Sequence, residues 1–390
     1  MSKTALMYCC QNAPHAGDIQ RTVALADELS EQFEVTMLLN EQSSQTVIAP
    51  ESIKLVFLPA RHAGKRQHPS PTRRDSLLRT YHDLRPRVVV IEGFPFGQDH
   101  LREDYLPLIE LARSGRYGES LVACMADSIL ADDPSGDEAR SDRIADILNR
   151  SFDIVIIRSD PVFARIEEFF QPGSTLHTPM YHTGFVVRRR NRAQRVAHRN
   201  RQGVVVSADG QHGMNLFRSA IEAHRTLQNI IPLPMTVTTG EGLSEGDWRS
   251  LQLLAQGLPA LSLKRGSSDW SAEIAAARWS INQCDYNSAV DILRTQTPSL
   301  FVPRPGKSHR EQIERAKRLV YWGAGRLLMP RHLNTASLIN EIHQLTKFES
   351  RSLNFDLNGA NNAAQLIAQI VYNNNYTPVS ARPSSDTRLH

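Results

Sequence analysis

The sequence lacks the features that mark secreted, membrane-spanning or metal-binding proteins. It has only four cysteines in 390 residues, and no two of them show Cys-x-x-Cys spacing. We therefore expect reduced cysteines that serve packing, rather than disulfides or metal ligands. No apolar run approaches the roughly 18 residues of a membrane span, and the apolar stretch at residues 5–10 is too short for a signal-peptide core. These absences predict a cytoplasmic protein.

An excess of charge of one sign is also missing. The 45 Lys and Arg residues are balanced by 41 Asp and Glu, for a formal net charge of +4, which argues against a nucleic-acid partner. Residues 188–201 are a local exception, with seven arginines. A run of this kind is typical of a solvated linker. The alternative is contact with anionic phospholipid headgroups, which would make the protein peripheral at the inner face of the membrane.

The hydrophobic pattern indicates two α/β domains of similar size. Short apolar runs alternate with helical patterns in the first half, and the alternation restarts at residue 204. Strands that are apolar on both faces and separated by helices predict doubly wound, Rossmann-like parallel sheets. The expected strands are 5–10, 35–39, 54–58, 88–91, 121–125, 154–157, 204–207, 234–238, 258–263, 279–282 and 300–302. The expected helices are 19–33, 214–227, 288–294, 309–322, 335–345 and 363–372.

These patterns predict the domain boundaries. We expect an N-terminal Rossmann-like domain over residues 1–187, an arginine-rich linker over 188–203 and a C-terminal Rossmann-like domain over 204–360. A closing helix over 361–373 and a polar tail over 374–390 follow, and the composition of the tail predicts disorder.

The segment from 279 to 328 carries the richest chemical pattern. Within it, the turn Tyr286-Asn287-Ser288 follows a predicted strand and opens a predicted helix. Ser288 is a good N-cap, and the free N–H groups of a helix start suit a diphosphate. Asp291 lies three residues later, where it is able to act as a capping partner or to reach a ribose diol. This turn is the predicted centre of a nucleotide-binding site.

Three blocks of this segment together resemble a known family. They are the turn with Asp291, then Pro-Ser-Leu-Phe-Val-Pro at 298–303, then Glu-Gln-Ile-Glu-Arg-Ala at 311–316. They resemble the donor-binding motif of the bacterial peptidoglycan N-acetylglucosaminyltransferase family and, more closely, a group of bacterial glycosyltransferases related to it. The pattern of that group is Gly-Gly-Tyr-Asn-Thr, Glu, Pro-Ala-Leu-x-Val-Pro and Glu-Gln-x-x-Arg-Ala. Blocks at 90–97, 126–130 and 159–161 look like the N-terminal strand ends of the same group.

The resemblance implies a GT-B glycosyltransferase, with two Rossmann-like domains that face each other across the active-site cleft. It implies inverting transfer from a nucleotide sugar, expected to be a UDP-sugar, to a hydroxyl of a glycan, a lipid-linked glycan or a small molecule. GT-B enzymes work without an Asp-x-Asp-bound metal, and the sequence has no Asp-x-Asp, so we expect neither a metal nor another cofactor. By position, the resemblance assigns the ribose to Asp291, the diphosphate to Tyr286, Asn287 and Ser288, and the donor sugar to Glu311 and Gln312.

The sequence departs from the family pattern at the centre of the motif. Cys284 and Asp285 stand where the family has paired glycines, which permit close backbone approach to phosphate. The carboxylate of Asp285 would repel a phosphate, and Asp291 is one methylene shorter than the family's Glu. Two alternatives therefore stay open: a non-catalytic paralogue that acts as a binding or partner protein, and a sugar-nucleotide 2-epimerase, which shares this architecture.

A second candidate site is the turn over residues 11–18, after the first predicted strand. Related enzymes have a glycine-rich turn that ends in a histidine at a helix start. Here Gly17 is kept and Asp18 replaces the histidine, while His15 lies three residues earlier. Either Asp18 or His15 is able to serve as the general base that takes the acceptor proton. The alternative is that Asp18 only N-caps the following helix.

Further candidates follow other predicted strands. Ser207, Gly210 and Gly213 belong to a strand–loop–helix that resembles the family's phosphate-cradling opening of the C-terminal domain. Lys264 and Arg265 follow a later strand, where this fold usually meets the nucleotide base, or they form a surface loop. Glu92 and Asp127 end two N-terminal strands and are acceptor-side candidates, or helix caps.

Overall fold

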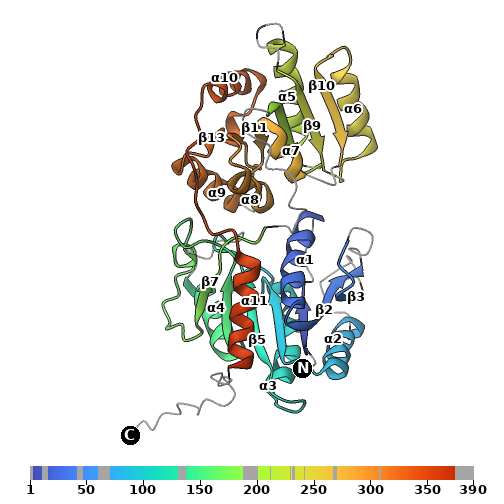
Figure 1. Ribbon diagram of the computed structural model, residues 1–390, viewed down its shortest axis with the longest axis vertical. Helices are drawn as coiled ribbons and strands as arrows, with labels where there is room; N and C mark the ends of the chain where they lie inside the picture. The colour runs from blue at the N-terminus through green and yellow to red at the C-terminus, as the bar shows by residue number, and fades with distance from the viewer. Residues whose placement is uncertain are drawn as a thin grey trace. The chain divides into compact units, whose positions relative to one another are not determined.

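The computed structural model describes residues 3–10, 16–41, 47–59, 71–130, 138–187, 201–210, 212–228, 230, 233–240, 242–266, 270–306 and 309–373, without the side chains of residues 16–18, 71 and 72. The chain divides into two compact units, whose elements are labelled in Figure 1. Unit 1 comprises Met1–Arg189 and Asp356–His390, and unit 2 comprises Arg190–Phe355.

Unit 1 is built on a seven-stranded parallel sheet in the order β3-β2-β1-β4-β5-β6-β7. Its central strands are buried apolar runs, as expected for a sheet covered on both faces. The strands are β1 (Thr4–Cys9), β2 (Phe33–Asn40), β3 (Ile53–Leu58), β4 (Val88–Glu92), β5 (Leu121–Ala126), β6 (Ile154–Ile157) and β7 (Met180–His182). The helices are α1 (Ala16–Ser30), α2 (Pro71–Leu84), α3 (Arg102–Arg113), α4 (Glu138–Ser151) and α11 (Gly359–Tyr372), with 3-10 turns η2 (Asp99–Leu101) and η4 (Ile166–Glu168).

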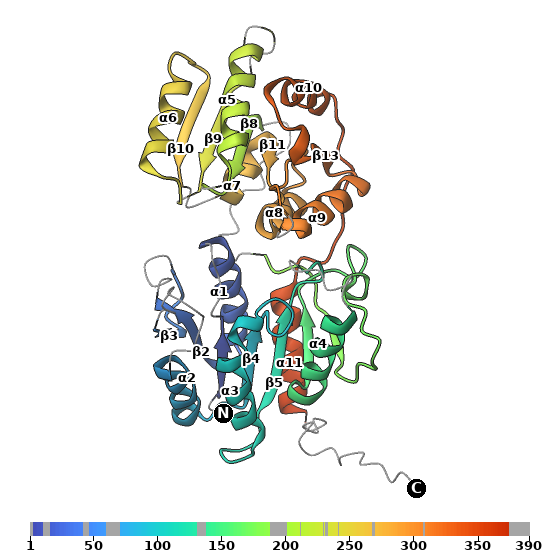
Figure 2. The same ribbon diagram turned by 180° about the vertical axis from the view of Figure 1, so that it is seen from behind.

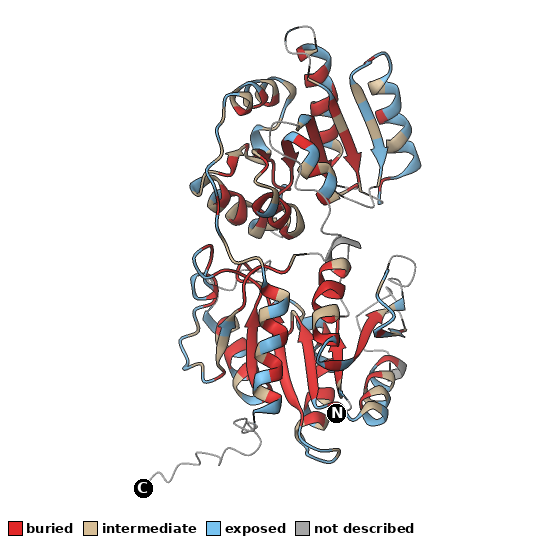
Figure 3. Cartoon of the chain, in the orientation of Figure 1, coloured by how far each residue is buried: buried red, intermediate tan, exposed pale blue. Residues whose placement is uncertain are grey.

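Helices cover both faces of this sheet. Helices α1 and α11 pack side by side on one face, and α2, α3 and α4 lie on the other, as Figures 1 and 2 show from opposite sides. Figure 3 shows the sheet buried between them, while the outer faces of the helices are exposed.

The last helix belongs to the first unit. The Asp356 N–H donates to Asp160 Oδ2 over 2.8 Å, and the Phe185 N–H donates to the Asp356 carbonyl over 2.8 Å. At the other end of α11, the Tyr372 ring stacks on Phe33 with the centroids 5.5 Å apart. The polypeptide therefore returns from unit 2 to complete the core of unit 1.

Unit 2 repeats the architecture with a six-stranded parallel sheet in the order β10-β9-β8-β11-β12-β13. The strands are β8 (Gln202–Ala208), β9 (Met235–Thr239), β10 (Leu261–Arg265), β11 (Ala277–Asn282), β12 (Ser299–Phe301) and β13 (Gly325–Leu327). The helices are α5 (Met214–Leu227), α6 (Glu245–Ala255), α7 (Trp270–Ala276), α8 (Tyr286–Thr295), α9 (Arg310–Tyr321) and α10 (Thr335–Thr346), with a 3-10 turn η7 (Pro330–His332).

The predicted fold class, α/β with two Rossmann-like, doubly wound parallel sheets, is confirmed. In each sheet the strand order reverses beside the first strand, between β1 and β4 in unit 1 and between β8 and β11 in unit 2. Sheets of this kind hold ligands at the carboxyl ends of the strands beside such a reversal. None of the helices within the described residues is long and apolar enough to span a membrane.

Element boundaries differ from the predictions in informative ways. Helix α8 begins at Tyr286 because Asp285, rather than Ser288, is the N-cap, so the expected capping role of Ser288 is wrong. Strand β10 begins at Leu261, after a turn, instead of at residue 258. The hydrophobic pattern did not predict helices α2, α3, α4, α6 and α7 or the three-residue strands β7 and β13. In segments that are so polar or so short, too few apolar residues are present to reveal the hydrophobic periodicity of a helix or a strand.

Candidate donor and acceptor sites

The loop after β8 is joined to two other loops by a polar cluster. The Asp209 N–H and the Arg304 Nε both donate to Gln283 Oε1, each over 3.1 Å. Arg304 Nη2 also lies 3.1 Å from Asp209 Oδ2, so a nearly buried ion pair closes the triangle. We call these three residues the Asp209–Gln283–Arg304 cluster. It fixes the loops at the carboxyl ends of β8, β11 and β12 relative to one another.

The predicted glycines of the first loop serve close packing. A Cβ on Gly210 would lie 2.5 Å from the backbone nitrogen of Leu243, and one on Gly213 would lie 2.6 Å from Ala208 Cβ. Gly240, in the loop after β9, is equally tight, because its Cβ would meet the Gly210 nitrogen at 2.7 Å. The loop after β8 therefore packs backbone to backbone on the loop after β9, and α5 begins directly against β8. Ser207, at the end of β8, is buried.

The start of α8 shows why the family has glycine before its Tyr-Asn turn. Cys284 has a φ of 59°, in the left-handed region that favours glycine. Asp285 follows as the N-cap, and its Oδ1 accepts the Ser288 N–H over 2.8 Å. Burial raises the pKa of the Cys284 thiol well above its ordinary value, so this thiol stays protonated near neutral pH. At one of the two glycine positions of the pattern, the backbone therefore has a left-handed conformation, which strains Cys284 but would not strain a glycine.

A buried cation lies against this helix start. Arg315 is 5% exposed; its Nη1 donates to the Cys284 carbonyl over 2.9 Å, and its guanidinium lies 5.9 Å from the centroid of the Tyr286 ring. Within the described part of the chain, Arg315 has no carboxylate partner. Its positive charge therefore adds to the positive end of the α8 dipole.

The three carboxyl and amide residues predicted to hold the donor differ in accessibility. Asp291 is 4% exposed, and its Oδ1 accepts a hydrogen bond from Ser271 Oγ over 2.5 Å, with Arg294 Nη2 at 3.8 Å. Gln312 is buried, and its Oε1 accepts the Arg304 N–H over 3.0 Å. Glu311 is half-buried in the first turn of α9. A ribose hydroxyl at Asp291 would have to share the carboxylate with Ser271.

Lys264 and Arg265 lie on the edge strand, apart from the other predicted donor residues. Lys264 Nζ pairs with Glu273 Oε1 at 3.1 Å, and Arg265 Nη1 pairs with Glu245 Oε2 at 2.6 Å. Strand β10 is separated from β8 by β9. The structure therefore brings together Ser207, Gly210, Gly213, Gln312 and the Tyr286–Ser288 turn, but it leaves these two cations at the sheet edge.

The acceptor-side turn is mostly outside the described residues. His15 is not described, and neither is the side chain of Asp18. Helix α1 begins at Ala16, so the backbone of Asp18 is inside the first turn rather than at the N-cap. The choice between Asp18 and His15 as the base stays a prediction.

Glu92 and Asp127 meet in a buried ion-pair network that sequence reasoning did not foresee. Arg158, at the end of β6, contacts Glu92 Oε1 through Nη1 and Asp127 Oδ1 through Nε, the latter at 3.0 Å. Arg21 of α1 lies 3.8 Å from each of the two carboxylates. Thr22 Oγ1 donates to Glu92 Oε2 over 3.0 Å. Two arginines and two carboxylates thus balance at the carboxyl ends of β4, β5 and β6.

The network determines the charge state of Glu92. Burial by itself raises the pKa of this carboxyl, but the attraction of Arg158 and Arg21 outweighs it, so the pKa of Glu92 lies below its ordinary value. Glu92 is 7% exposed, whereas the Asp127 side chain is 26% exposed. Asp127 is therefore the member of the network that faces solvent.

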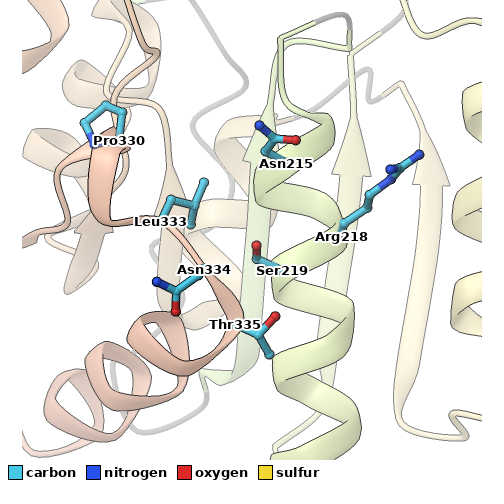
Figure 4. A pocket seen from close by; sticks show the side chains of 7 residues that line it. All are labelled: Asn215, Arg218, Ser219, Pro330, Leu333, Asn334 and Thr335. Atoms are coloured by element: carbon cyan, nitrogen blue, oxygen red, sulfur yellow. The ribbon is translucent and has the colours of Figure 1, made fainter.

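A hollow of about 300 Å³ lies beside the first turns of α5, as Figure 4 shows. Asn215, Arg218 and Ser219 of α5 face Leu333, Asn334 and Thr335, which lead into α10. None of the residues predicted to hold the donor lines it. This hollow is polar and lies on the outer side of α5, so it does not coincide with the clustered loops.

One family model matches the second half of unit 2 and continues into α11 of unit 1. Residues 269–370 match the family model described as the glycosyltransferase family 28 C-terminal domain. This range contains the α8 start, Asp291, Arg304, Glu311, Gln312 and Arg315. No curated protein sequence matches the chain.

Solved structures share the fold along nearly the whole chain. The calicheamicin glycosyltransferase CalG4 aligns with a TM-score of 0.59 at 14% identity, over 95% of this chain and 94% of that one. MurG of Acinetobacter baumannii aligns with a TM-score of 0.57 at 14% identity, over 95% and 100%. A protein named as a UDP-N-acetylglucosamine 2-epimerase, from Listeria monocytogenes, aligns with a TM-score of 0.63 at 12% identity, over 96% and 99%. These matches confirm the GT-B fold, and the family 28 match over residues 269–370 agrees with the predicted MurG-like resemblance of that segment.

Proposed function

From this GT-B glycosyltransferase scaffold with its family 28 domain, we propose that the chain transfers a sugar from a UDP-sugar to an acceptor hydroxyl, with inversion and without a metal or cofactor. The observation that carries the proposal is the α8 start, where the helix dipole and the buried Arg315 supply positive charge beside the N-cap carboxylate of Asp285, and Arg315 itself has no carboxylate partner in the described chain. A diphosphate leaving group carries the complementary charge. Stabilising that charge is the electrostatic task that a metal performs in other enzymes.

Each candidate residue has a role in this proposal. The Tyr286–Ser288 turn and the Gly210–Gly213 loop bind the diphosphate, Asp291 binds the ribose, and Glu311 and Gln312 contact the sugar. Asp18 or His15 takes the proton from the acceptor, which is a glycan, a lipid-linked glycan or a small molecule. The match of residues 269–370 to a family 28 domain supports the donor assignments.

Calorimetric titration with UDP, GDP and dTDP tests the donor site. We expect UDP to bind most tightly, and Asp291→Ala to lose at least about tenfold in affinity, as expected for removal of a charged hydrogen-bond acceptor. Ser271→Ala is the matched control, because it removes the partner of the carboxylate but keeps the carboxylate. Failure of all three nucleotides to bind would overturn the proposal.

A second experiment separates transfer from the alternatives. Labelled UDP-sugar is incubated with acceptors of the three classes, with and without a chelator, and the anomeric configuration of the product is read by NMR. Transfer with inversion that survives chelation is expected. Epimerised donor or free UDP in the absence of an acceptor would favour a 2-epimerase, which is supported by the likeness to the Listeria protein. Tight binding without turnover would favour a non-catalytic paralogue, which is supported by the Asp285 carboxylate at the helix start.

A further inference from the structure

A second hollow lies at the opposite edge of the unit 2 sheet from the clustered loops. Because all six strands are parallel, their amino ends share one edge, and Arg201, Arg278 and Pro298 stand at or next to the amino ends of β8, β11 and β12. The hollow has a volume of about 360 Å³. The side chains that matter for its chemistry are Arg201, Arg278, Trp279, Lys347, Phe348 and Glu349. We call it the amino-edge pocket.

Among the described residues, the three cations of the amino-edge pocket have no carboxylate partner. Arg201 Nη1 donates to Thr297 Oγ1 over 3.0 Å and Nη2 to the Thr295 carbonyl over 2.5 Å, while its Nε is buried without a hydrogen-bond partner. The Arg278 guanidinium lies 4.3 Å from the centroid of the Trp279 ring. For the residues that the structure describes, neither arginine nor Lys347 forms an ion pair.

Four other cations of unit 2 do have carboxylate partners. Arg304, Lys264, Arg265 and Arg326 each pair with a carboxylate at 2.6–3.1 Å. Removing a cation from water without a counterion costs free energy, and desolvation accordingly lowers the pKa of Arg201. Against three cations the pocket offers one carboxylate, Glu349, so an anionic ligand would offset an excess of positive charge.

We propose that the amino-edge pocket binds a phosphate group that carries an organic substituent. Guanidinium groups and an ammonium group are the usual donors to phosphate oxygens, and Trp279 and Phe348 supply an apolar wall for the substituent. The pocket is as large as the smaller ligand sites of proteins. A soluble phosphate ester and a phospholipid headgroup present the same chemistry.

The test reverses the two exposed positive charges of the pocket. Arg278→Glu/Lys347→Glu leaves Arg201 in place, since Arg201 also holds the end of α8. Arg74→Glu/Arg79→Glu on the exposed side of α2 is the matched control, with the same change in net charge. Binding of inorganic phosphate is followed by NMR through the indole N–H signal of Trp279, which is assigned with Trp279→Phe. This signal reports on the pocket and not on phosphate bound at the donor loops. Sedimentation with phosphatidylcholine vesicles, with and without an equal part of phosphatidylglycerol, tests the headgroup.

We expect the pocket variant to lose about tenfold or more in affinity for at least one probe, while the control variant keeps it. Loss of the phosphate response indicates a soluble ligand, and loss of binding to phosphatidylglycerol vesicles alone indicates a headgroup; either supports the site. UDP affinity is expected to be unchanged in the pocket variant, which keeps this test separate from the proposed transferase activity. No response of the wild type to either probe, or equal responses of variant and wild type to both, would overturn the proposal.

Discussion

The two units present polar groups at the same place in the same kind of sheet, but they balance charge differently. In unit 1, Arg21 and Arg158 meet Glu92 and Asp127, so that two positive and two negative charges stand together. In unit 2, Arg304 is paired with Asp209, but Arg315 has no carboxylate partner in the described chain. A balanced network stabilises its own loops, whereas an unbalanced cation favours an anionic ligand. On electrostatic grounds, the comparison supports the proposal that the nucleotide binds in unit 2.

The strongest way to break the comparison is to remove one charge from the balanced network. Arg158→Leu leaves Glu92 buried with only the more distant Arg21, and we expect the free energy of unfolding to fall by about 3–5 kcal/mol. Chemical denaturation measures the loss. Glu92→Leu/Arg158→Leu is the control, because replacing both partners removes the uncompensated charge and should recover part of the stability. A loss below about 1 kcal/mol for the single variant would show that the network carries little stability.

The opposite result is expected in unit 2. Arg315→Gln removes an unbalanced cation, so stability should change little while affinity for UDP falls by about 10–100-fold. Calorimetry and denaturation of the same sample separate the two effects. Arg326→Gln is the matched control, since Arg326 pairs with Glu341 away from the α8 start. Equal UDP affinity in Arg315→Gln and wild type would contradict the electrostatic role.

A smaller effect distinguishes two buried cysteines, one in each unit. Cys284 has a positive φ, whereas Cys124 lies in the regular strand β5. We expect Cys284→Gly to be more stable than Cys284→Ala by about 1 kcal/mol, because glycine avoids the left-handed strain. At Cys124 the order should reverse, with alanine favoured by about 0.5–1 kcal/mol. Thermal unfolding of the four variants checks this, and the same order at both sites would show that the backbone at Cys284 is not strained.

The smallest effect is the pH dependence of the balanced network. The pKa of Glu92 is lower in the folded protein than in the unfolded chain, where it is about 4.3. The unfolded state therefore binds more protons in this range. The stabilisation is complete above the unfolded pKa and is lost as the pH falls through the folded pKa. Unfolding free energy measured from pH 6 downward should fall less steeply in Glu92→Gln than in wild type, and identical slopes would contradict the lowered pKa.

The fold was predictable where it depends on local apolar runs. Strands such as Val88–Glu92 and Ile154–Ile157 are buried on both faces, so their composition alone indicates a covered parallel sheet. The exact ends of helices and strands depend on backbone geometry and hydrogen bonds that a local hydrophobic pattern does not show. Asp285 rather than Ser288 caps α8, and the choice follows from backbone geometry at Cys284.

The sites were predictable only in part, for a related reason. A family motif points to residues in sequence order, and it led to the α8 start and to Gln312. Arg158 and Arg304 gain their roles from carboxylates 31 and 95 positions away, Asp127 and Asp209, so no spacing rule reveals them. In the sequence, Arg304 is marked only as a charged residue between two prolines, directly after the family block at 298–303. The role of Asp18 or His15 as the general base remains a prediction.

The return of the chain to unit 1 has a consequence for synthesis on the ribosome. Residues Ala363, Ala364 and Ile367 of α11 are buried in the core that α1 also lines. A nascent chain that ends at residue 355 contains all of unit 2 but lacks α11. The apolar surface of unit 1 that α11 covers is then exposed to water. The first unit to be translated is therefore the last to be finished, and it is the one that would recruit chaperones while the second folds.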